Sequence, residues 1–462
     1  MLRLSYRVFR LGSWLRYMVP RRFTSAGLLA LAALGVTAAI GLDMDQTVAF
    51  QGLALLSCLL AVAIVASWFF RGQFGATRWL PRFGSVGEPL RYLVTVHNRN
   101  GRRLEHLELF EDLADPRPTL SEYIEAHNEQ AGPGGPGRWW RRMRARPPEV
   151  RRATTRSATL PPLPAAGQTE TRVELLPLKR GPLRFTGLTV AQPDPLGWFR
   201  GFVRIPLPQT VLILPKRYPL PGFSLPGTRQ YQQGGVVLAS AIGESEEFLS
   251  LRDYRPGDPL RHIHWRSWAR IGRPIVREFE DEFMVRHALV LDTFAALGQR
   301  QAFEEAVSVA ASFACTVDTQ ESLLDLLFVG ARAVCFTTGR GLGQSEQALE
   351  ILASVQPCRT QEFAVLQELV MRHAGSTCGC IIILLAWDEP RRELVKRLRA
   401  MGLPLVVLLV VSPAEASAIR HAPNGERAGA GAGTEAQSER FHLLELGKVG
   451  EDLQRMAGGL GR

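Results

Sequence analysis

Residues 253–282 hold the side chains of this chain that are best suited to acid-base chemistry. Two histidines, His262 and His264, closely follow Asp258, and imidazole and carboxyl groups are the usual general acids and bases of enzymes. On one continuous helix, Asp258 and His262 would lie four residues apart and face each other. The pattern therefore predicts a hydrolase as one of two functions to be weighed, although no G-x-S-x-G nucleophile motif lies nearby.

The arginines of the same stretch are nearly balanced by carboxylates, which favours ion-paired scaffolding over a bare phosphate-binding surface. Residues 256–257 predict a turn, Asp258 a helix N-cap and Gly272 a C-cap glycine. We expect a loop, one helix and an extended segment that joins the neighbouring domains. On this hypothesis Arg261 or Arg270 is paired in a dry interface, and the alternative is an exposed recognition surface.

Two long apolar runs near the N-terminus predict a membrane anchor. They cover residues 25–42 and 48–70 and follow six arginines without any acidic residue. A bilayer core of about 30 Å needs about 20 apolar residues, so each run is long enough for a spanning helix. Arginines flank the outer ends, whereas only Asp43 and Asp45 carry charge between the runs. The positive-inside rule then places both ends in the cytoplasm.

The region 77–220 changes to short alternating runs separated by Gly, Pro and Asn, which is typical of an antiparallel β-sandwich or barrel. Residues 126–156 are rich in Gly, Pro and Arg and too poor in aliphatic residues to form a core. We interpret them as a disordered basic insertion near the anionic cytoplasmic leaflet. The alternative is a site for single-stranded nucleic acid, with Trp139 and Trp140 as stacking groups.

The last third of the chain alternates aliphatic runs with helical patterns, as expected of a doubly wound α/β domain. The expected strands are 287–292, 323–330, 333–336, 379–387 and 403–411, and the expected helices include 344–355, 361–373 and 389–401. In such a domain ligands bind at the C-terminal ends of the strands, here just after Asp292 and near Asp388.

The overall composition agrees with several folded domains in a reducing compartment. A hydrophobic fraction of 46% in 462 residues is enough for at least two cores. The formal net charge of +11 indicates an anionic neighbour, such as the inner face of a membrane. The six cysteines have no paired C-x-x-C spacing, so we expect no structural zinc, disulfide or cofactor.

Two segments resemble one known family. EFLSLRDYRPGDPLRHIHWRSWARIGRPIVREFEDE, at 247–282, resembles the defining motif of the bacterial and archaeal proteins grouped as domain of unknown function fifty-eight, and KRGPLRFTGLTVAQPDPLGWFR, at 179–200, resembles a second segment of that family. The resemblance implies a von Willebrand A-like C-terminal domain and an association with MoxR-type AAA+ ATPases, but no known reaction. The signature residues that it assigns to interaction are Arg252, Tyr254, Gly257, Asp258, Arg261, Ile263, Trp265, Ala269 and Arg270.

The chain departs from the metal-binding pattern of von Willebrand A domains. Those that bind Mg²⁺ carry Asp-x-Ser-x-Ser after the first strand, because a hard cation requires oxygen ligands. Here Asp292 is followed by Phe294 and Ala296 at the two serine positions, and Asp388 is a second carboxylate after a later strand. Since two oxygen ligands are missing, we expect a metal-free interaction domain with a degenerate site at Asp292.

We therefore expect a membrane protein with two N-terminal transmembrane helices, a β-sandwich-like domain and a doubly wound, von Willebrand A-like α/β domain. The expected boundaries are 1–24 for a basic cytoplasmic N-terminus, 25–70 for the helical hairpin, 77–220 for the β-rich domain, 240–285 for the signature segment, 286–412 for the α/β domain and 413–462 for a flexible tail. The preferred function is a non-enzymatic adaptor in the cell membrane that acts with a MoxR-type ATPase in assembling or remodelling envelope or membrane complexes. Its partners would be that ATPase, the lipid bilayer and other membrane or envelope proteins, without specific nucleic acid.

Overall fold

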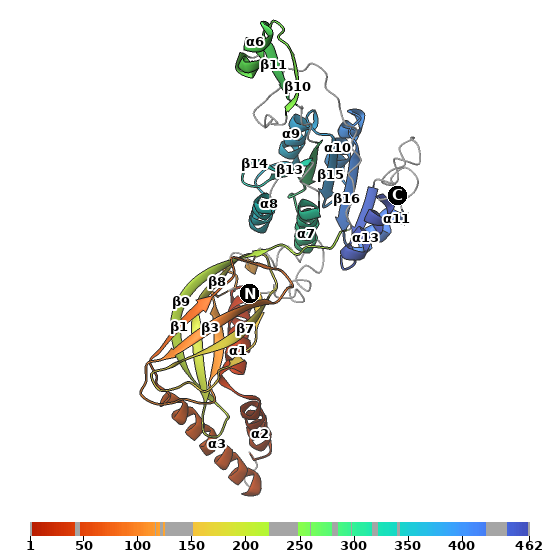
Figure 1. Ribbon diagram of the computed structural model, residues 1–462. Coiled ribbons are helices and arrows are strands. Elements are labelled where there is room, and N and C mark those ends of the chain that lie inside the picture. The colour runs from red at the N-terminus through yellow and green to blue at the C-terminus, as the bar shows by residue number, and fades with distance from the viewer. Residues whose placement is uncertain are drawn as a thin grey trace. The chain divides into compact units, whose positions relative to one another are not determined.

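The computed structural model describes residues 2–41, 47–115, 117–120, 123–124, 151–220, 248–258, 260–279, 285–296, 298–316, 322–339, 342–421 and 441–460. The chain divides into two compact units (Figure 1). The first contains the N-terminal helices and the β-rich region up to residue 219, and the second contains most of the chain from residue 248 on.

Three helices precede the first strand: α1 (Leu2–Arg22), α2 (Ser25–Gly41) and α3 (Thr47–Trp68). The last two contact each other and form the expected helical pair (Figure 1). Within the described residues, one apolar stretch is long enough to cross a membrane, the 19 residues Phe50–Trp68 of α3, with a mean hydropathy of 2.2. The apolar stretch of α2, Ser25–Ala39, is shorter. The sequence did not assign a helix to the basic N-terminus, where α1 is found.

The β-rich region consists of two sheets that face each other, a sandwich-like arrangement. One sheet has the order β1 (Phe74–Trp79), β3 (Leu90–Asn98), β7 (Gln168–Pro177) and β5 (Ala153–Thr155). The other has the order β2 (Phe83–Ser85), β9 (Arg200–Leu214), β8 (Gly181–Pro193), β4 (Glu108–Leu113) and β6 (Ala158–Thr159). Strand β5 lies within the predicted insertion 126–156, so that its last residues belong to the sheet, while 125–150 lie outside the described residues.

Side-chain alternation explains why the two sheets pack together. On β7 the side chain of Leu175 is fully buried in the core between the sheets, whereas its neighbour Leu176 is 36% exposed. Tyr92 and Val94 on β3 are buried in the same core, as the alternating sequence predicts. A slip of one residue in the pairing of β7 would turn this apolar set toward water.

The sandwich core also contains a buried ion pair that was not predicted from the sequence. Arg78 and Glu111 approach to 2.9 Å, and both side chains are almost completely buried. Burial raises the pKa of Glu111 to about 7, although the positive charge of Arg78 opposes that shift. Arg78 also donates to the carbonyl oxygen of Gly187 and lies over the ring of Phe185. The pair therefore ties strands of both sheets together.

The second unit contains a six-stranded mixed sheet in which all strands are parallel except β14. Its order is β14 (Ala333–Thr338), β13 (Ser322–Val329), β12 (Val285–Leu291), β15 (Gly379–Leu384), β16 (Leu405–Val411) and β17 (Phe441–Glu445). The helices along this part of the chain are α7 (Arg300–Thr316), α8 (Leu342–Ser354), α9 (Phe363–Ala374), α10 (Glu389–Ala400), α11 (Pro413–His421) and α13 (Val449–Leu460). The sheet continues past residue 412, where the sequence analysis places a tail, because β17 pairs with β16.

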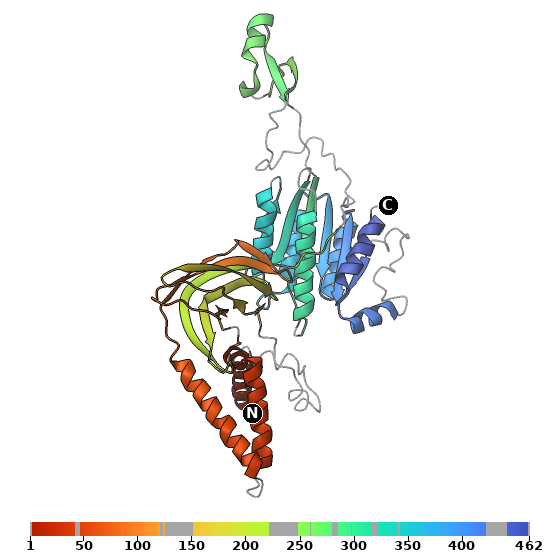
Figure 2. The same ribbon diagram turned by 60° about the horizontal axis from the view of Figure 1, so that its bottom comes forward.

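The signature segment folds as a small ribbon with helical turns. Strands β10 (Phe248–Asp253) and β11 (Ile275–Phe279) pair in antiparallel fashion, and the turn η1 (Leu260–His262) and helix α6 (Trp265–Ile271) lie between them in the sequence. Figure 2 shows α6 beside the ribbon, which it contacts through β11. The prediction of a single helix from Asp258 to Gly272 is therefore wrong, because the chain leaves the helical path between η1 and α6.

The neighbouring leucines of β7 give a matched test of the sandwich core. We expect Leu175→Ala to lower the free energy of unfolding by about 2–5 kcal/mol, because it leaves a cavity in a closely packed core. Leu176→Ala removes the same atoms from a more exposed position and should cost far less. Thermal unfolding of the detergent-solubilised full chain measures both, and equal losses would contradict the assigned register of β7.

Candidate functional site

The strand-end position singled out by the sequence is occupied by an arginine side chain. Asp292 directly follows β12 and is completely buried. Its Oδ2 atom accepts a hydrogen bond from Nε of Arg391 at 2.6 Å and another from the backbone N–H of Leu385 at 3.1 Å. A guanidinium group thus lies against the carboxylate at which the family pattern would have placed a metal ligand.

Helix α10 positions Arg391. Asp388 is the N-cap of this helix and accepts from the backbone N–H of Arg391, and the two side chains also form an ion pair. The Arg391 guanidinium lies 4.8 Å from the ring centre of Phe363 and is 7% exposed. Burial by itself lowers the pKa of Arg391, but the charges and hydrogen bonds of Asp292 and Asp388 together outweigh it, and the net pKa is raised. Arg391 is therefore a fixed positive charge between two carboxylates.

This arrangement joins both predicted strand-end carboxylates, Asp292 and Asp388, through one side chain that sequence reasoning missed. Within the described ranges, no group of three or more His, Cys, Asp or Glu side chains is placed to hold a metal ion. The geometry provides neither a free general base nor an open cation position at Asp292. The signal that could have found Arg391 is the Asp-Glu-Pro-Arg sequence, in which the third residue after an N-cap aspartate points back toward the strand end.

In the signature segment, Asp258 is committed to structure. Its two carboxylate oxygens accept from the guanidinium of Arg252 at 2.7 and 2.9 Å, and the backbone N–H of Arg255 donates to it at 2.8 Å. The hydrogen bonds from Arg252 lower the pKa of Asp258 to about 2. Because η1 begins at Leu260, Asp258 and His262 do not share a helix, and Asp258 is paired with Arg252 in place of the predicted His262.

The remaining signature residues divide into an inner and an outer group. Ile263 is buried and forms a bridge with Val276, while Gly257 adopts a φ of 108° that favours glycine. Gly272 is the left-handed C-cap of α6, as predicted, with its N–H donating to the carbonyl of Trp268. The half-buried Tyr254 donates its backbone N–H to Pro274. The exposed signature residues are Arg261, Trp265, Ala269 and Arg270.

The outer group presents aromatic surface to solvent. Trp265 is 64% exposed and stacks on Trp268, with 5.1 Å between ring centres; we call these two residues the tryptophan pair. Arg261 and Arg270 are exposed as well, so the expected burial of these arginines in a dry interface is not observed. Exposed tryptophan and arginine are the residue types that most often dominate binding at protein interfaces.

A third site, at the boundary between the N-terminal helices and the β-rich region, was not predicted as a functional site. It is the turn between β8 and β9, in the segment 179–200 that carries part of the family resemblance. Oδ1 of Asp194 accepts from the backbone N–H groups of Trp198 and Phe199, each at 2.7 Å, and Oδ2 accepts from Leu196 at 3.0 Å. One carboxylate therefore fixes the conformation of the whole turn.

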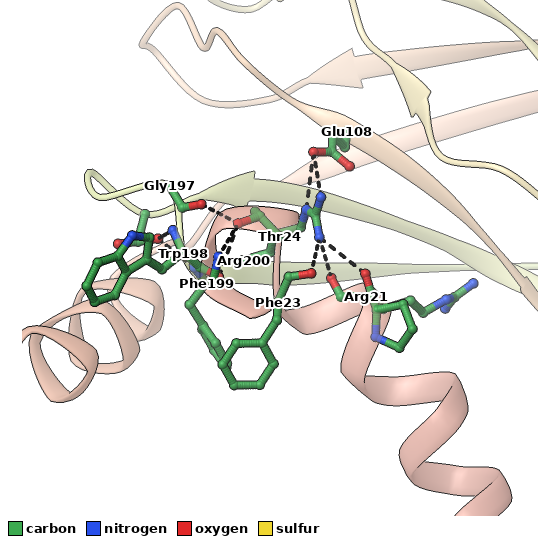
Figure 3. Close-up of polar contacts among 11 residues, drawn as sticks. Arg21, Phe23, Thr24, Glu108, Gly197, Trp198, Phe199 and Arg200 are labelled. Carbon is green, nitrogen blue, oxygen red and sulfur yellow. Dashed lines mark hydrogen bonds and ion pairs between the residues drawn. The ribbon is translucent and has the colours of Figure 1, made fainter. Parts of the chain in front are cut away.

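This turn receives the start of α2. The hydroxyl of Thr24 accepts from the backbone N–H of Gly27 as an N-cap and donates to the carbonyl of Gly197, and the N–H of Thr24 donates to the carbonyl of Trp198 (Figure 3). A β-carbon on Gly27 would collide with the carbonyl oxygen of Trp198. Only glycine allows α2 and the turn to approach this closely.

Arg200 fastens the end of α1 to the same turn. Its guanidinium donates to the carbonyl oxygens of Pro20, Arg21 and Phe23, and it pairs with Glu108 on β4 at 3.1 Å (Figure 3). These carbonyls belong to the last turn of α1 and the residue after it, where backbone acceptors lack intrahelical partners. The cation also complements the negative end of the helix dipole.

The junction extends to α3 and to the edge of β4. A β-carbon on Gly201 would meet the carbonyl of Ser67 and the side chain of Phe70 at the end of α3. Arg21 pairs with Asp112 at 2.6 Å, and both side chains are mostly buried. We call the contacts of Thr24, Asp194 and Arg200 with their neighbours the helix–sheet junction. It attaches the β-rich region to all three N-terminal helices.

Comparison with known proteins identifies the class of the domain formed by residues 250–416. Residues 250–416 match the family described as "Protein of unknown function DUF58", and the chain therefore carries a domain of that family. A curated relative, the "Uncharacterized protein YeaD" of Bacillus subtilis (strain 168), is 29% identical over 182 residues, which cover 39% of this chain and 44% of the relative. The chain thus spans less than half the length of this relative.

Two solved structures of one domain also align, with low similarity. They are the crystal and solution structures of the CARDB domain of the PF1109 protein from Pyrococcus furiosus, each 12% identical to this chain. The crystal structure aligns with 32% of this chain and 91% of its own length at a TM-score of 0.17, and the solution structure aligns with 30% and 93% at a TM-score of 0.16.

We expect Arg391→Ala to lower the free energy of unfolding by about 3–5 kcal/mol, because it leaves the carboxylate of Asp292 buried without its cationic partner. Arg397→Ala is the matched control on the same helix. Its side chain is 55% exposed and pairs with Glu393 in the neighbouring turn, so the substitution should cost no more than about 1 kcal/mol. Thermal or denaturant unfolding of the full chain measures the difference.

The same measurement with and without Mg²⁺ examines the degenerate metal position. A true site would stabilise the wild-type protein by about 2.7 kcal/mol at a hundredfold excess over Kd. We expect no shift, since Arg391 supplies the positive charge at Asp292. A Mg²⁺-dependent rise in melting temperature that Asp292→Ala abolishes would show that the guanidinium does not exclude the ion.

Two glycines of α2, Gly27 and Gly35, allow a matched test of the helix–sheet junction. Gly27→Ala should destabilise the folded chain by about 1–3 kcal/mol, because the added methyl group collides with backbone that is held by Asp194. Gly35→Ala meets no atom within 4 Å and should be neutral or slightly stabilising. The midpoint of thermal unfolding in detergent distinguishes them, and equal midpoints would mean that α2 does not pack on the turn.

Proposed function

We propose that this protein is a membrane-anchored interaction protein that acts with a MoxR-type AAA+ ATPase in the assembly or remodelling of envelope or membrane complexes. The observation that carries the proposal is the exposed tryptophan pair of the signature segment. A solvent-exposed indole stacked on a second one offers a large, rigid contact area at low entropic cost. The exposed Arg261 and Arg270 beside it suit an acidic or polar rim on the partner.

The proposed anchoring of the protein in a membrane rests on α3 and on the helix–sheet junction. We infer that α2 crosses the bilayer together with α3, so that the protein is a multi-pass protein of the cell membrane. Arg21 and Arg22 precede α2, and Arg71 follows α3. By the positive-inside rule these arginines place the β-rich and α/β parts in the cytoplasm, where an AAA+ ATPase would meet them.

We further infer that the α/β domain is von Willebrand A-like and binds its partners without a metal ion. The mixed sheet, with Asp292 directly after the end of β12, supports this assignment. In place of a cation that bridges two proteins, the charge at Asp292 is neutralised internally by Arg391. Binding would then depend on shape and on apolar and ionic contacts, and it would not respond to chelators.

The alternative function, a hydrolase that uses the signature segment, receives less support from the geometry. Asp258 is held by Arg252, with its pKa lowered to about 2 by those hydrogen bonds, so it is a poor proton carrier near neutral pH. Nδ1 of His264 lies 2.6 Å from the hydroxyl of Ser267 within the same helical turn. We therefore propose that the protein is not an enzyme and that the signature residues serve binding.

Replacing Trp265 tests this proposal. We expect Trp265→Ser to weaken capture of the MoxR-type ATPase of the same organism by about 30-fold or more, since a tryptophan at the centre of an interface contributes roughly 2 kcal/mol or more. The melting temperature should stay unchanged, because the side chain is 64% exposed. Trp79→Ser, at a 78% exposed tryptophan on β1, is the matched control and should bind as the wild type does.

The measurement is co-purification of the tagged full-length protein with the purified ATPase, followed by titration of the detergent-solubilised pair. Wild-type affinity of Trp265→Ser would remove the tryptophan pair from the interface. Absence of binding by the wild-type chain would reject the ATPase as partner, while leaving the anchoring part of the proposal to be judged by membrane fractionation.

A further inference from the structure

Helix α1 carries an apolar stripe that the protein does not cover. Leu4, Val8, Leu11 and Leu15 follow one another at helical spacing and are 67%, 64%, 59% and 44% exposed. Side chains three and four residues apart lie on the same face of a helix, so these four form a continuous strip. An apolar strip exposed over about three helical turns marks a surface that contacts another partner.

The other side of α1 is already occupied by the chain itself. The ring of Phe9 stacks on that of Tyr123 at 5.1 Å, and Tyr6 packs against the same ring at 5.3 Å. The hydroxyl of Tyr6 donates to the carbonyl of Pro118, and Ser5 shares a hydrogen bond with the hydroxyl of Tyr123. The helix is therefore fixed with its apolar stripe turned away from these contacts.

The position of α1 in the chain puts the stripe at the level of the membrane surface. Only Phe23 and Thr24 separate α1 from α2, and Arg200 holds the end of α1. The next residue, Gly201, touches the end of α3, where Trp68 and Phe69 are 70% and 80% exposed. Exposed aromatic residues at the end of an apolar helix are typical of the bilayer interface.

The charges of α1 identify the kind of surface. The helix has six arginines and no acidic residue. Arg3, Arg7 and Arg10 lie along one border of the stripe and Arg16 along the other, and all four are exposed. Long arginine side chains can bury their methylene groups beside an apolar stripe while the guanidinium reaches lipid phosphates. This distribution fits an anionic leaflet better than an acidic groove on a protein. The arginines would pair with acidic groups in either case, but the stripe between them is aliphatic and needs an apolar surface.

We propose that α1 lies in the head-group layer of an anionic membrane leaflet, with Leu4, Val8, Leu11 and Leu15 in contact with acyl chains and its arginines bound to lipid phosphates. The β-rich region rests on the opposite side of the helix and is thereby held close to the membrane. This surface is separate from the signature segment, and the inference does not depend on the ATPase partner.

Photo-crosslinking in vesicles tests the placement of α1. The photoreactive residue p-benzoylphenylalanine is introduced in place of Leu11 in the full-length chain, which is reconstituted in vesicles of phosphatidylglycerol and phosphatidylcholine in equal amounts. We expect lipid adducts at this position. The control is the same residue in place of Leu93, which is 45% exposed on β3 of the sandwich, and there we expect none. Equal lipid yields at the two positions, or protein adducts at position 11 in place of lipid, would overturn the proposal.

The role of the arginines is tested by changing the lipid composition of the vesicles and by removing positive charges from α1. Each cation near an anionic surface contributes about fivefold to the association, so the combined variant Arg3→Gln, Arg7→Gln and Arg10→Gln should lower the lipid yield from position 11 severalfold. The wild-type yield should fall similarly in vesicles of phosphatidylcholine alone. Yields that respond neither to the substitutions nor to the lipid charge would refute the binding of anionic head groups. Circular dichroism and the melting temperature of each variant verify that the fold is unchanged.

Discussion

The guanidinium of Arg200 is the interaction on which the arrangement of the first unit depends. The last carbonyl groups of a helix have no intrahelical partner and must find another hydrogen-bond donor. Arg200 satisfies three of these acceptors at the end of α1 and is itself neutralised by Glu108 on β4. Arg200 thus supplies hydrogen bonds to the carbonyl groups at the end of α1 and attaches that helix to the sheet that contains β4.

The close approach of α2 and α3 to the turn between β8 and β9 follows from this attachment. Asp194 preorganises the turn before Arg200, and Thr24 caps α2 on the same turn. Gly27 and Gly201 then allow α2 and α3 to touch the turn without an intervening side chain. The junction therefore holds α2 and α3 in a fixed position against the β-rich region.

A second recurring feature is the use of buried arginines as internal counter-ions. Arg78 neutralises Glu111 within the sandwich, and Arg391 neutralises Asp292 at the strand ends of the mixed sheet. A buried ion pair adds little net stability compared with apolar packing, but the loss of one partner is costly. Such pairs therefore act mainly as constraints on geometry. At Asp292 the constraint also removes the chemistry that a free carboxylate would offer.

The sequence by itself determined the elements whose signals are local. Aliphatic runs specified β12, β15 and β16, because strands covered on both faces have no polar side to display. The apolar residues of α3 and the glycine C-cap at Gly272 were readable for the same reason. The exposed apolar stripe of α1 was present as a helical period of leucine and valine, but the arginines among those residues concealed it.

Tertiary structure alone decided which charges meet. Asp292 and Arg391 are 99 residues apart in the sequence, and Arg200 reaches Phe23 across 177 residues. It also decided that Asp258 binds Arg252 and that the predicted helix divides into η1 and α6, because the ion pair and the bridge between Ile263 and Val276 are satisfied only when the chain leaves the helical path.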